Sequence, residues 1–200
     1  MGKIIHGNKN FGYAPINVSD GGVYSYGTPV LLSGMVSSSA EVEQSDTSIY
    51  ADDKTYCLIK GAKARSLEVT LKYIPSTYAQ YLGFKLNANG VLTDTGSFPN
   101  HVIFFETEEE DCETGDTTRT LHYFYNVKGG EPSKETNTDE EEVTAQDITV
   151  SYSCMESAFT KDDDNEYVQY AYLTRTDANA ATYDTFNTTV LTPSSVMNSY

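Results

Sequence analysis

Strict alternation of apolar and polar side chains in two separate segments is the feature that most constrains the fold of this chain. In residues 66–73 every second side chain is apolar: Leu67, Val69, Leu71 and Tyr73. Residues 147–154 repeat the pattern with a second apolar set: Ile148, Val150, Tyr152 and Cys154. A period of two is that of a strand with one buried and one solvated face. The pattern therefore predicts a mainly β protein built from antiparallel sheets.

Other segments fit the same architecture. Residues 36–43 alternate again, with Glu41 and Glu43 on the polar side, and residues 102–105 are apolar throughout, as in a central strand covered on both faces. Residues 77–82 predict one short helix, which Gly83 can end in the left-handed conformation. Sixteen tyrosines and no tryptophan also favour β-structure, since aromatic side chains suit a pleated, half-buried surface.

The stretch 119–154 combines several of these signals. It predicts a strand over 120–127, a loop over 128–133, an acidic run over 139–142 and a second strand over 143–154. The two strands are expected to form an antiparallel pair with an acidic rim.

The 200 residues are expected to form a single domain. We divide it into an N-terminal arm (1–28), an antiparallel β-sandwich or barrel (29–174) and a C-terminal arm (175–200). The sandwich carries one flanking helix and an excursion over 45–63, which is too long for a tight hairpin turn.

A net charge of −16 excludes broad classes of partner. Nucleic-acid binding needs Lys and Arg to neutralise phosphates, and anionic membranes need the same residues. Three cysteines without a CxxC motif fit a reducing compartment, and neither a signal peptide nor a bilayer-length apolar run is present. The chain is therefore expected to be made in a cytoplasm, although acidity alone identifies no function.

Catalytic and metal-binding patterns are weak. The three histidines, His6, His101 and His122, lack metal-ligand spacing with one another or with the cysteines. Residues 162–166 resemble a calcium loop but lack its glycine and distal glutamate, so a solvated turn is the better interpretation. Acids in 106–113 could supply a glycosidase carboxylate pair, yet a hairpin tip explains them more simply. We predict neither an enzyme nor a cofactor.

Several short segments, in order and spacing, resemble the major tail protein (tail tube subunit) family of long, non-contractile-tailed phages that infect Gram-positive bacteria. The matching pieces are residues 11–16, 50–56, 75–83, 124–133, the strand to Ser153, and the ending from Tyr183 to Pro193. They span most of the chain, while the acidic hairpin over 106–113 departs from the pattern.

The resemblance implies a subunit that assembles with itself into hexameric rings, which stack into a hollow tube in the virion. It further implies a tape-measure protein, a tail terminator and baseplate or distal tail proteins as partners, and passage of DNA without specific binding. Four acids on the polar faces of predicted strands are candidates for the lumen: Glu41, Glu43, Glu68 and Asp147. The alternative that they face outer solvent is equally open.

The excursion and the two arms are expected to reach a neighbouring subunit or ring, and Tyr50, Asp52, Asp53 and Tyr56 are the candidate contact residues. Two other functions compete with the tail tube. One is a carbohydrate-binding or surface-binding β-sandwich, such as an adhesin module, and the other is a tube subunit of a secretion system.

Overall fold

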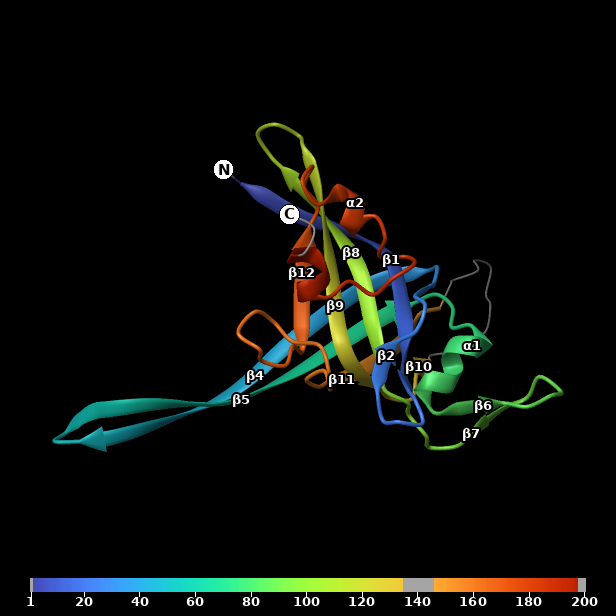
Figure 1. Ribbon diagram of the computed structural model, residues 1–200, viewed down its shortest axis with the longest axis horizontal. Helices are drawn as coiled ribbons and strands as arrows, with labels where there is room; N and C mark the ends of the chain where they lie inside the picture. The colour runs from blue at the N-terminus through green and yellow to red at the C-terminus, as the bar shows by residue number, and fades with distance from the viewer. Residues whose placement is uncertain (1, 135–145, 198–200) are drawn as a thin grey trace, which may run out of the picture.

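The computed structural model describes residues 2–134 and 146–197, and it shows one large antiparallel sheet with short helices (Figure 1). The sheet has ten strands, and its main path runs in the order β2-β1-β8-β9-β11-β5-β4. β3 and β12 pair at the sides with β1 and β9, and β10 pairs with β11. The strands are β1 (Lys3–Val18), β2 (Tyr24–Tyr26), β3 (Val30–Leu31), β4 (Met35–Ala51), β5 (Lys54–Leu71), β8 (His101–Asp111), β9 (Thr117–Gly129), β10 (Ser133–Lys134), β11 (Ile148–Cys154) and β12 (Tyr170–Thr174).

The sheet curls until its two ends approach each other, which gives the barrel-like form predicted from the sequence. The Leu32 N–H donates a hydrogen bond of 2.7 Å to the Phe11 carbonyl, just before β4 begins. Within β4, the Ser38 hydroxyl donates to Asn8 Oδ1 of β1 at 3.2 Å. These contacts join the β4 end of the sheet to β1.

The main core fills the inside of the curled sheet. Leu67 and Val69 of β5 lie opposite Tyr152 and Val150 of β11, and all four side chains are buried. Because directly opposite residues share a face, the two alternating segments project into the same core, as predicted. Burial of side chains of this size stabilises a fold by about 1.5–3 kcal/mol each.

A short helical segment covers this core on its other side. It consists of α1 (Ser76–Ala79) and the 3₁₀ turn η1 (Gln80–Leu82), and Gly83 ends it with a φ of 95°. Tyr78 and Leu82 are fully buried, so the predicted helix and its glycine cap are confirmed. The two-strand sheet of β6 (Phe84–Leu86) and β7 (Leu92–Asp94) follows it.

A second core lies on the other face of β8 and β9, and residues from the predicted C-terminal arm fill it. Phe104 of β8 packs there with four buried side chains of the C-terminal segment: Tyr183, Phe186, Val190 and Leu191. This segment contains α2 (Ala180–Tyr183) and α3 (Pro193–Met197). The expectation of an extended C-terminal arm is therefore wrong up to Leu191, because the segment folds back over the sheet.

The N-terminal region is likewise part of the sheet rather than an arm. β1 runs along β8 from Lys3 to Pro15, and Phe11 and Ala14 are completely buried. β8 therefore lies between β1 and β9, and all four residues 102–105 are buried, as expected for a central strand.

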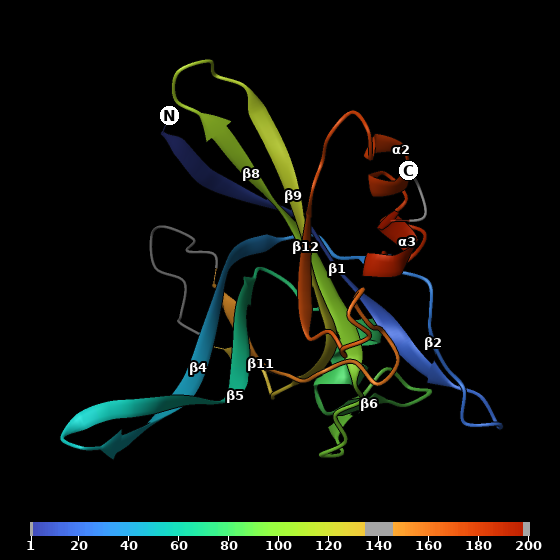
Figure 2. The same ribbon diagram turned by 60° about the vertical axis from the view of Figure 1, so that its left-hand side comes forward.

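Residues 45–63 were expected to form an irregular excursion, but they belong to a long two-stranded hairpin. β4 and β5 pair from Met35 and Leu71 to Ala51 and Lys54, with shifts of register along the way, and Asp52 and Asp53 form a two-residue turn. The outer part of this hairpin, residues 45–63, projects far from the body (Figures 1 and 2), and we call it the hairpin arm. No helix among the described residues is both long and apolar enough to cross a membrane.

β9 and β11 pair antiparallel through Val127 and Cys154, which confirms the strand pair predicted for 119–154. β11 begins at Ile148 rather than at 143. The acidic run over 139–142 lies outside the described residues.

Candidate assembly surfaces

The structure brings the four candidate lumen acids to one face of three neighbouring strands. In the register of β4 and β5, Ser39 lies opposite Glu68 and Glu41 lies opposite Ser66. Glu43, two residues beyond Glu41, continues the same face, and Asp147 reaches it from the start of β11 through an ion pair with Lys72. All four acids are exposed.

This surface, which we call the polar face, consists of one side of β4, β5 and the β11 region. Its members occupy every second position along these segments and are Ser37, Ser39, Glu41, Glu43, Ala64, Ser66, Glu68, Thr70, Asp147, Thr149, Ser151 and Ser153. A hydrogen bond of 3.3 Å between the Thr70 and Thr149 hydroxyls confirms that both strands present these side chains on the same side. Ala64 is the only apolar residue in this set, so the face is compatible with water.

The opposite side of β4 is apolar but only partly covered. Ala40 lies opposite Leu67 and Val42 opposite Arg65, on the side of the main core. Nevertheless, Val36 is 44% exposed and Val42 is 48% exposed. The strand also has one unpaired edge beyond Ser39 among the described residues, because its partner there is β5 alone. A row of unpaired backbone groups beside apolar side chains is a surface that pairs readily with another chain.

The hairpin arm carries the four candidate contact residues at its tip. Tyr50 is 70% exposed and Tyr56 is 80% exposed, while Asp52 and Asp53 form the turn with φ values of 51° and 59°. Three aliphatic side chains on the arm are also about half exposed: Ile49, Leu58 and Ile59. These three residues were not among those predicted from the sequence, although an apolar cluster outside the core indicates a contact site.

A bulge near the base of the arm changes the strand register. Gln44 lies opposite Lys63 whereas Asp46 lies opposite Lys60, so β5 has one extra residue there. A Cβ atom on Gly61 would lie 2.5 Å from Ser45 Oγ and 2.7 Å from Ser45 O. A side chain at position 61 would therefore clash with the backbone of the facing strand, which favours glycine there.

The acids of 106–113 do not form a catalytic pair. Glu106 is fully buried and accepts hydrogen bonds from the Tyr183 hydroxyl, at 2.7 Å, and from the Asn10 amide. Glu108 is bound by Lys9 at 2.8 Å, and this hydrogen bond lowers the pKa of the Glu108 carboxyl. Glu106 was expected in a hairpin tip, but it instead fixes the C-terminal segment to the sheet.

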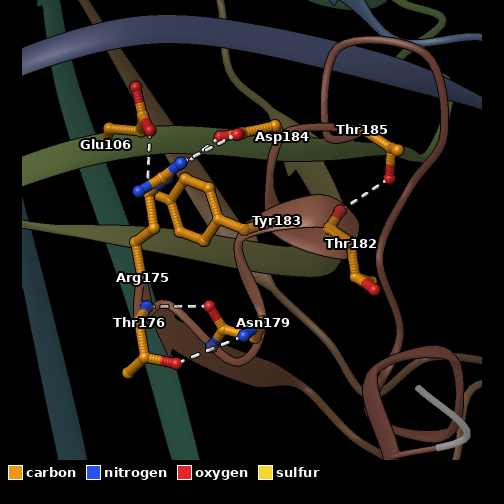
Figure 3. A network of polar contacts seen from close by, with 8 residues as sticks. All are labelled: Glu106, Arg175, Thr176, Asn179, Thr182, Tyr183, Asp184 and Thr185. Atoms are coloured by element: carbon orange, nitrogen blue, oxygen red, sulfur yellow. Dashed lines mark hydrogen bonds and ion pairs between the residues drawn. The ribbon is translucent and has the colours of Figure 1, made fainter. Parts of the chain in front are cut away.

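Figure 3 shows the surroundings of this contact. Arg175, just after β12, forms a two-point contact with the Asp184 carboxylate, with N···O distances of 3.1 and 2.9 Å. The Asn179 side chain accepts a hydrogen bond from the Thr176 N–H and donates one to the Thr174 carbonyl. These contacts shape the loop that delivers Tyr183 to Glu106.

The histidines have structural partners. His101 is buried between the Tyr78 hydroxyl and the Pro99 carbonyl, and His122 lies between the hydroxyls of Thr107 and Tyr170. His122 is half-buried and stacked on Phe105. Among residues 2–134 and 146–197, no three His, Cys, Asp or Glu side chains are grouped to hold a metal ion.

The whole chain was compared with known proteins and solved structures. A search of curated proteins found no match. A chain in the cryo-EM structure of the anti-feeding prophage (AFP) baseplate, 6-fold symmetrised, is similar with a TM-score of 0.41 and 9% identity, over 82% of this chain and 92% of that chain. A similarity this distant carries no argument about function.

The family comparison is more informative. A family model described as phage tail tube protein matches residues 2–199, which is nearly the whole sequence. Proteins of this family are structural components of the phage virion and are not enzymes. This chain therefore belongs to the phage tail tube protein family.

Proposed function

We propose that six copies of this protein form a ring, that rings stack into the tail tube, and that the polar face lines the lumen through which DNA leaves the virion. The observation that carries the proposal is the position of Glu41, Glu43, Glu68 and Asp147 on one exposed, non-apolar face of neighbouring strands. A sheet with one buried and one fully polar face suits the wall of a water-filled channel.

The chemistry of the face agrees with passage of DNA without binding. Duplex DNA carries one negative charge per roughly 1.7 Å of its axis, and a basic wall would hold it by counterion release. The lumen acids instead repel the phosphates, and at a Debye length of about 8–10 Å this repulsion acts only close to the wall.

Two strands of the sheet offer edges at which neighbouring subunits can join. One is the free edge of β4, and the other is β10, which pairs with β11 through Ser133 and Lys134. Pairing of these edges around a ring would join the inner sheets into one closed barrel without exposed edges. The neighbour would also cover Val36 and Val42, which a single subunit leaves exposed.

The hairpin arm supplies contact between rings. Its tyrosines and aliphatic side chains have no core to cover within their own subunit, and exposed apolar clusters mark interaction sites. The tape-measure protein would occupy the lumen during assembly, and the terminator and baseplate proteins would bind the two ends of the tube.

Electron microscopy of the purified protein at high concentration tests assembly directly, and stacked rings are the expected result. Deletion of residues 48–58 is expected to leave a folded subunit, with an unchanged circular dichroism spectrum, that no longer polymerises. Long tubes formed by the deletion variant would refute the role of the arm. A persistent monomer that binds glycans would favour the adhesin alternative, and genes for secretion beside this one would favour the secretion tube.

The orientation of the polar face needs a separate experiment. Glu68→Cys in a Cys57→Ser, Cys112→Ser background places one reactive thiol on the face. A maleimide on a bulky polymer is expected to label free subunits but not tubes, whereas a small maleimide labels both. Equal labelling of tubes by the bulky reagent would place Glu68 on the outer surface and overturn the assignment.

A further inference from the structure

Hydroxyl groups, rather than carboxylates, dominate the polar face. The strand register sets them in rows across the sheet. Ser37, Thr70, Thr149 and Ser133 of β10 form one row, because each lies directly opposite the next. Ser39, Glu68 and Ser151 form the second row, and Glu41, Ser66 and Ser153 the third. We call the eight Ser and Thr side chains of these rows the hydroxyl lattice.

The charges on this surface partly cancel. Lys72 forms an ion pair with Asp147, so that carboxylate is neutralised locally. Lys128 of β9 lies opposite Ser153 and is exposed, which places an ammonium group at the end of the third row. The two lysines thus reduce the net negative charge of the face, and repulsion by carboxylates alone is a weak account of how the wall avoids holding DNA.

We propose that the hydroxyl lattice is the surface along which DNA slides, and that the neutrality of its eight side chains matters more than the four carboxylates. This inference rests on the proposed function, because it requires the polar face to line the lumen. It deepens that function by naming the side chains that determine the speed of DNA passage.

The physical basis is the uniformity of the lattice. A hydroxyl donates one hydrogen bond and accepts others, so it exchanges partners between water and phosphate at little net gain. Residues on one face repeat about every 6.8 Å along a strand, and strands lie about 4.8 Å apart. A phosphate that moves over these eight hydroxyls would therefore meet similarly weak partners in turn, and none of them offers a deep minimum in which to stop.

The rows also predict where a single change would create such a minimum. Ser39, Ser66 and Ser151 are all exposed and lie at or beside the centre of the lattice. A lysine at any of them would add a ring of six ammonium groups to each layer of a hexameric tube. Each would bind phosphate by counterion release, a strongly salt-dependent attraction.

The test measures the time that single virions with stained DNA take to empty into host cells. We expect Ser39→Lys to lengthen emptying by about tenfold or more at low salt, with recovery at high salt. The matched control Ser39→Asn, and the double variant Glu41→Gln, Glu68→Gln, should stay within about twofold of the natural protein. Ser151→Lys repeats the test on another strand in case the first variant does not assemble.

Each outcome decides the matter. Emptying slowed by Glu41→Gln, Glu68→Gln as much as by Ser39→Lys would make the carboxylates the working groups and overturn the proposal. Normal emptying by Ser39→Lys and Ser151→Lys virions would also overturn it. If bulky maleimide labels Glu68→Cys in tubes, the proposed function fails instead, so the two failures can be distinguished.

Discussion

The hydroxyl of Tyr183 donates a hydrogen bond of 2.7 Å to Oε1 of Glu106, and both side chains are fully buried. The two residues lie on α2 and β8, 77 positions apart in the sequence. Burial is the main cause that raises the pKa of Tyr183, and the adjacent Glu106 raises it further, so the phenol remains a donor at neutral pH. The pair holds the C-terminal segment against the second core.

Tyr183→Phe tests this contact. The change keeps the ring in the core but leaves the buried Glu106 with one donor fewer, so we expect a loss of about 1–3 kcal/mol in the free energy of unfolding. Urea denaturation measures it. Tyr172→Phe is the control, because Tyr172 is largely exposed and its change should cost less than about 0.5 kcal/mol. Equal losses in the two variants would show that Glu106 does not depend on the Tyr183 hydroxyl.

His101 predicts sensitivity to acid. Burial lowers the pKa of His101 to about 4, whereas an unfolded histidine has a pKa of about 6.5. Between these values the unfolded chain binds more protons than the folded one, so stability falls as the pH falls from 6.5 to 4. The loss attributable to His101 is about 3 kcal/mol at pH 4.

The variant His101→Phe removes this proton linkage, although the Tyr78 hydroxyl and Pro99 carbonyl lose a partner. We expect a protein that is less stable at pH 7 but whose unfolding free energy changes less between pH 7 and 4. Chemical denaturation at several pH values gives both quantities. His6→Gln, which alters an exposed histidine outside both cores, is the control for loss of a histidine. A slope that is the same in His101→Phe and the natural protein would exclude His101 as the acid-sensitive group.

The sequence predicted best those parts of the fold that keep an unbroken period of two. The alternation in β5 and β11 correctly separated core residues such as Leu67 and Tyr152 from the polar face. The face was predictable, but its orientation in a tube was not, since a solvated lumen and outer solvent select the same side chains.

Irregular backbone accounts for what the sequence concealed. β1 has two breaks in register, with Gly7 and Asn10 at positive φ, so its buried positions Phe11 and Tyr13 do not continue the alternation of its first half. Burial of Glu106 could not be predicted for a different reason. It depends on the hydrogen bond from Tyr183, and a local sequence pattern does not reveal a partner 77 positions away.

Gly61 is predicted to set the geometry of the hairpin arm. Gly61→Val would force β4 and β5 apart at the bulge, since even a Cβ atom would lie 2.5 Å from Ser45 Oγ. Because the arm lies outside both cores, we expect a melting temperature close to that of the natural protein, with tube formation strongly reduced. Gly21→Ala is the control, as its nearest contact would be 4.0 Å. Normal tubes from Gly61→Val would show that assembly tolerates a displaced arm.

The turn at the tip of the arm can be changed in a way that is expected to stabilise the hairpin. Asp52 and Asp53 both adopt positive φ, which a two-residue turn of type I′ requires and which Asn-Gly adopts at lower cost. The double change Asp52→Asn, Asp53→Gly should stabilise the hairpin by about 1 kcal/mol, and Asp53→Val should destabilise it by a similar amount or more. Amide hydrogen exchange at Lys54 and Cys57 measures both effects, with slower exchange expected in the first variant by about fivefold.

The two turn variants also separate the shape of the arm from its charge. Asn-Gly removes both carboxylates while it improves the backbone geometry, whereas Val at position 53 removes one carboxylate and strains the turn. If the arm acts through its shape and its tyrosines, the first variant polymerises at least as well as the natural protein and the second polymerises poorly. Loss of tubes in the Asn-Gly variant, with its hairpin intact by hydrogen exchange, would instead make the Asp52 and Asp53 carboxylates the groups that bind the neighbouring ring.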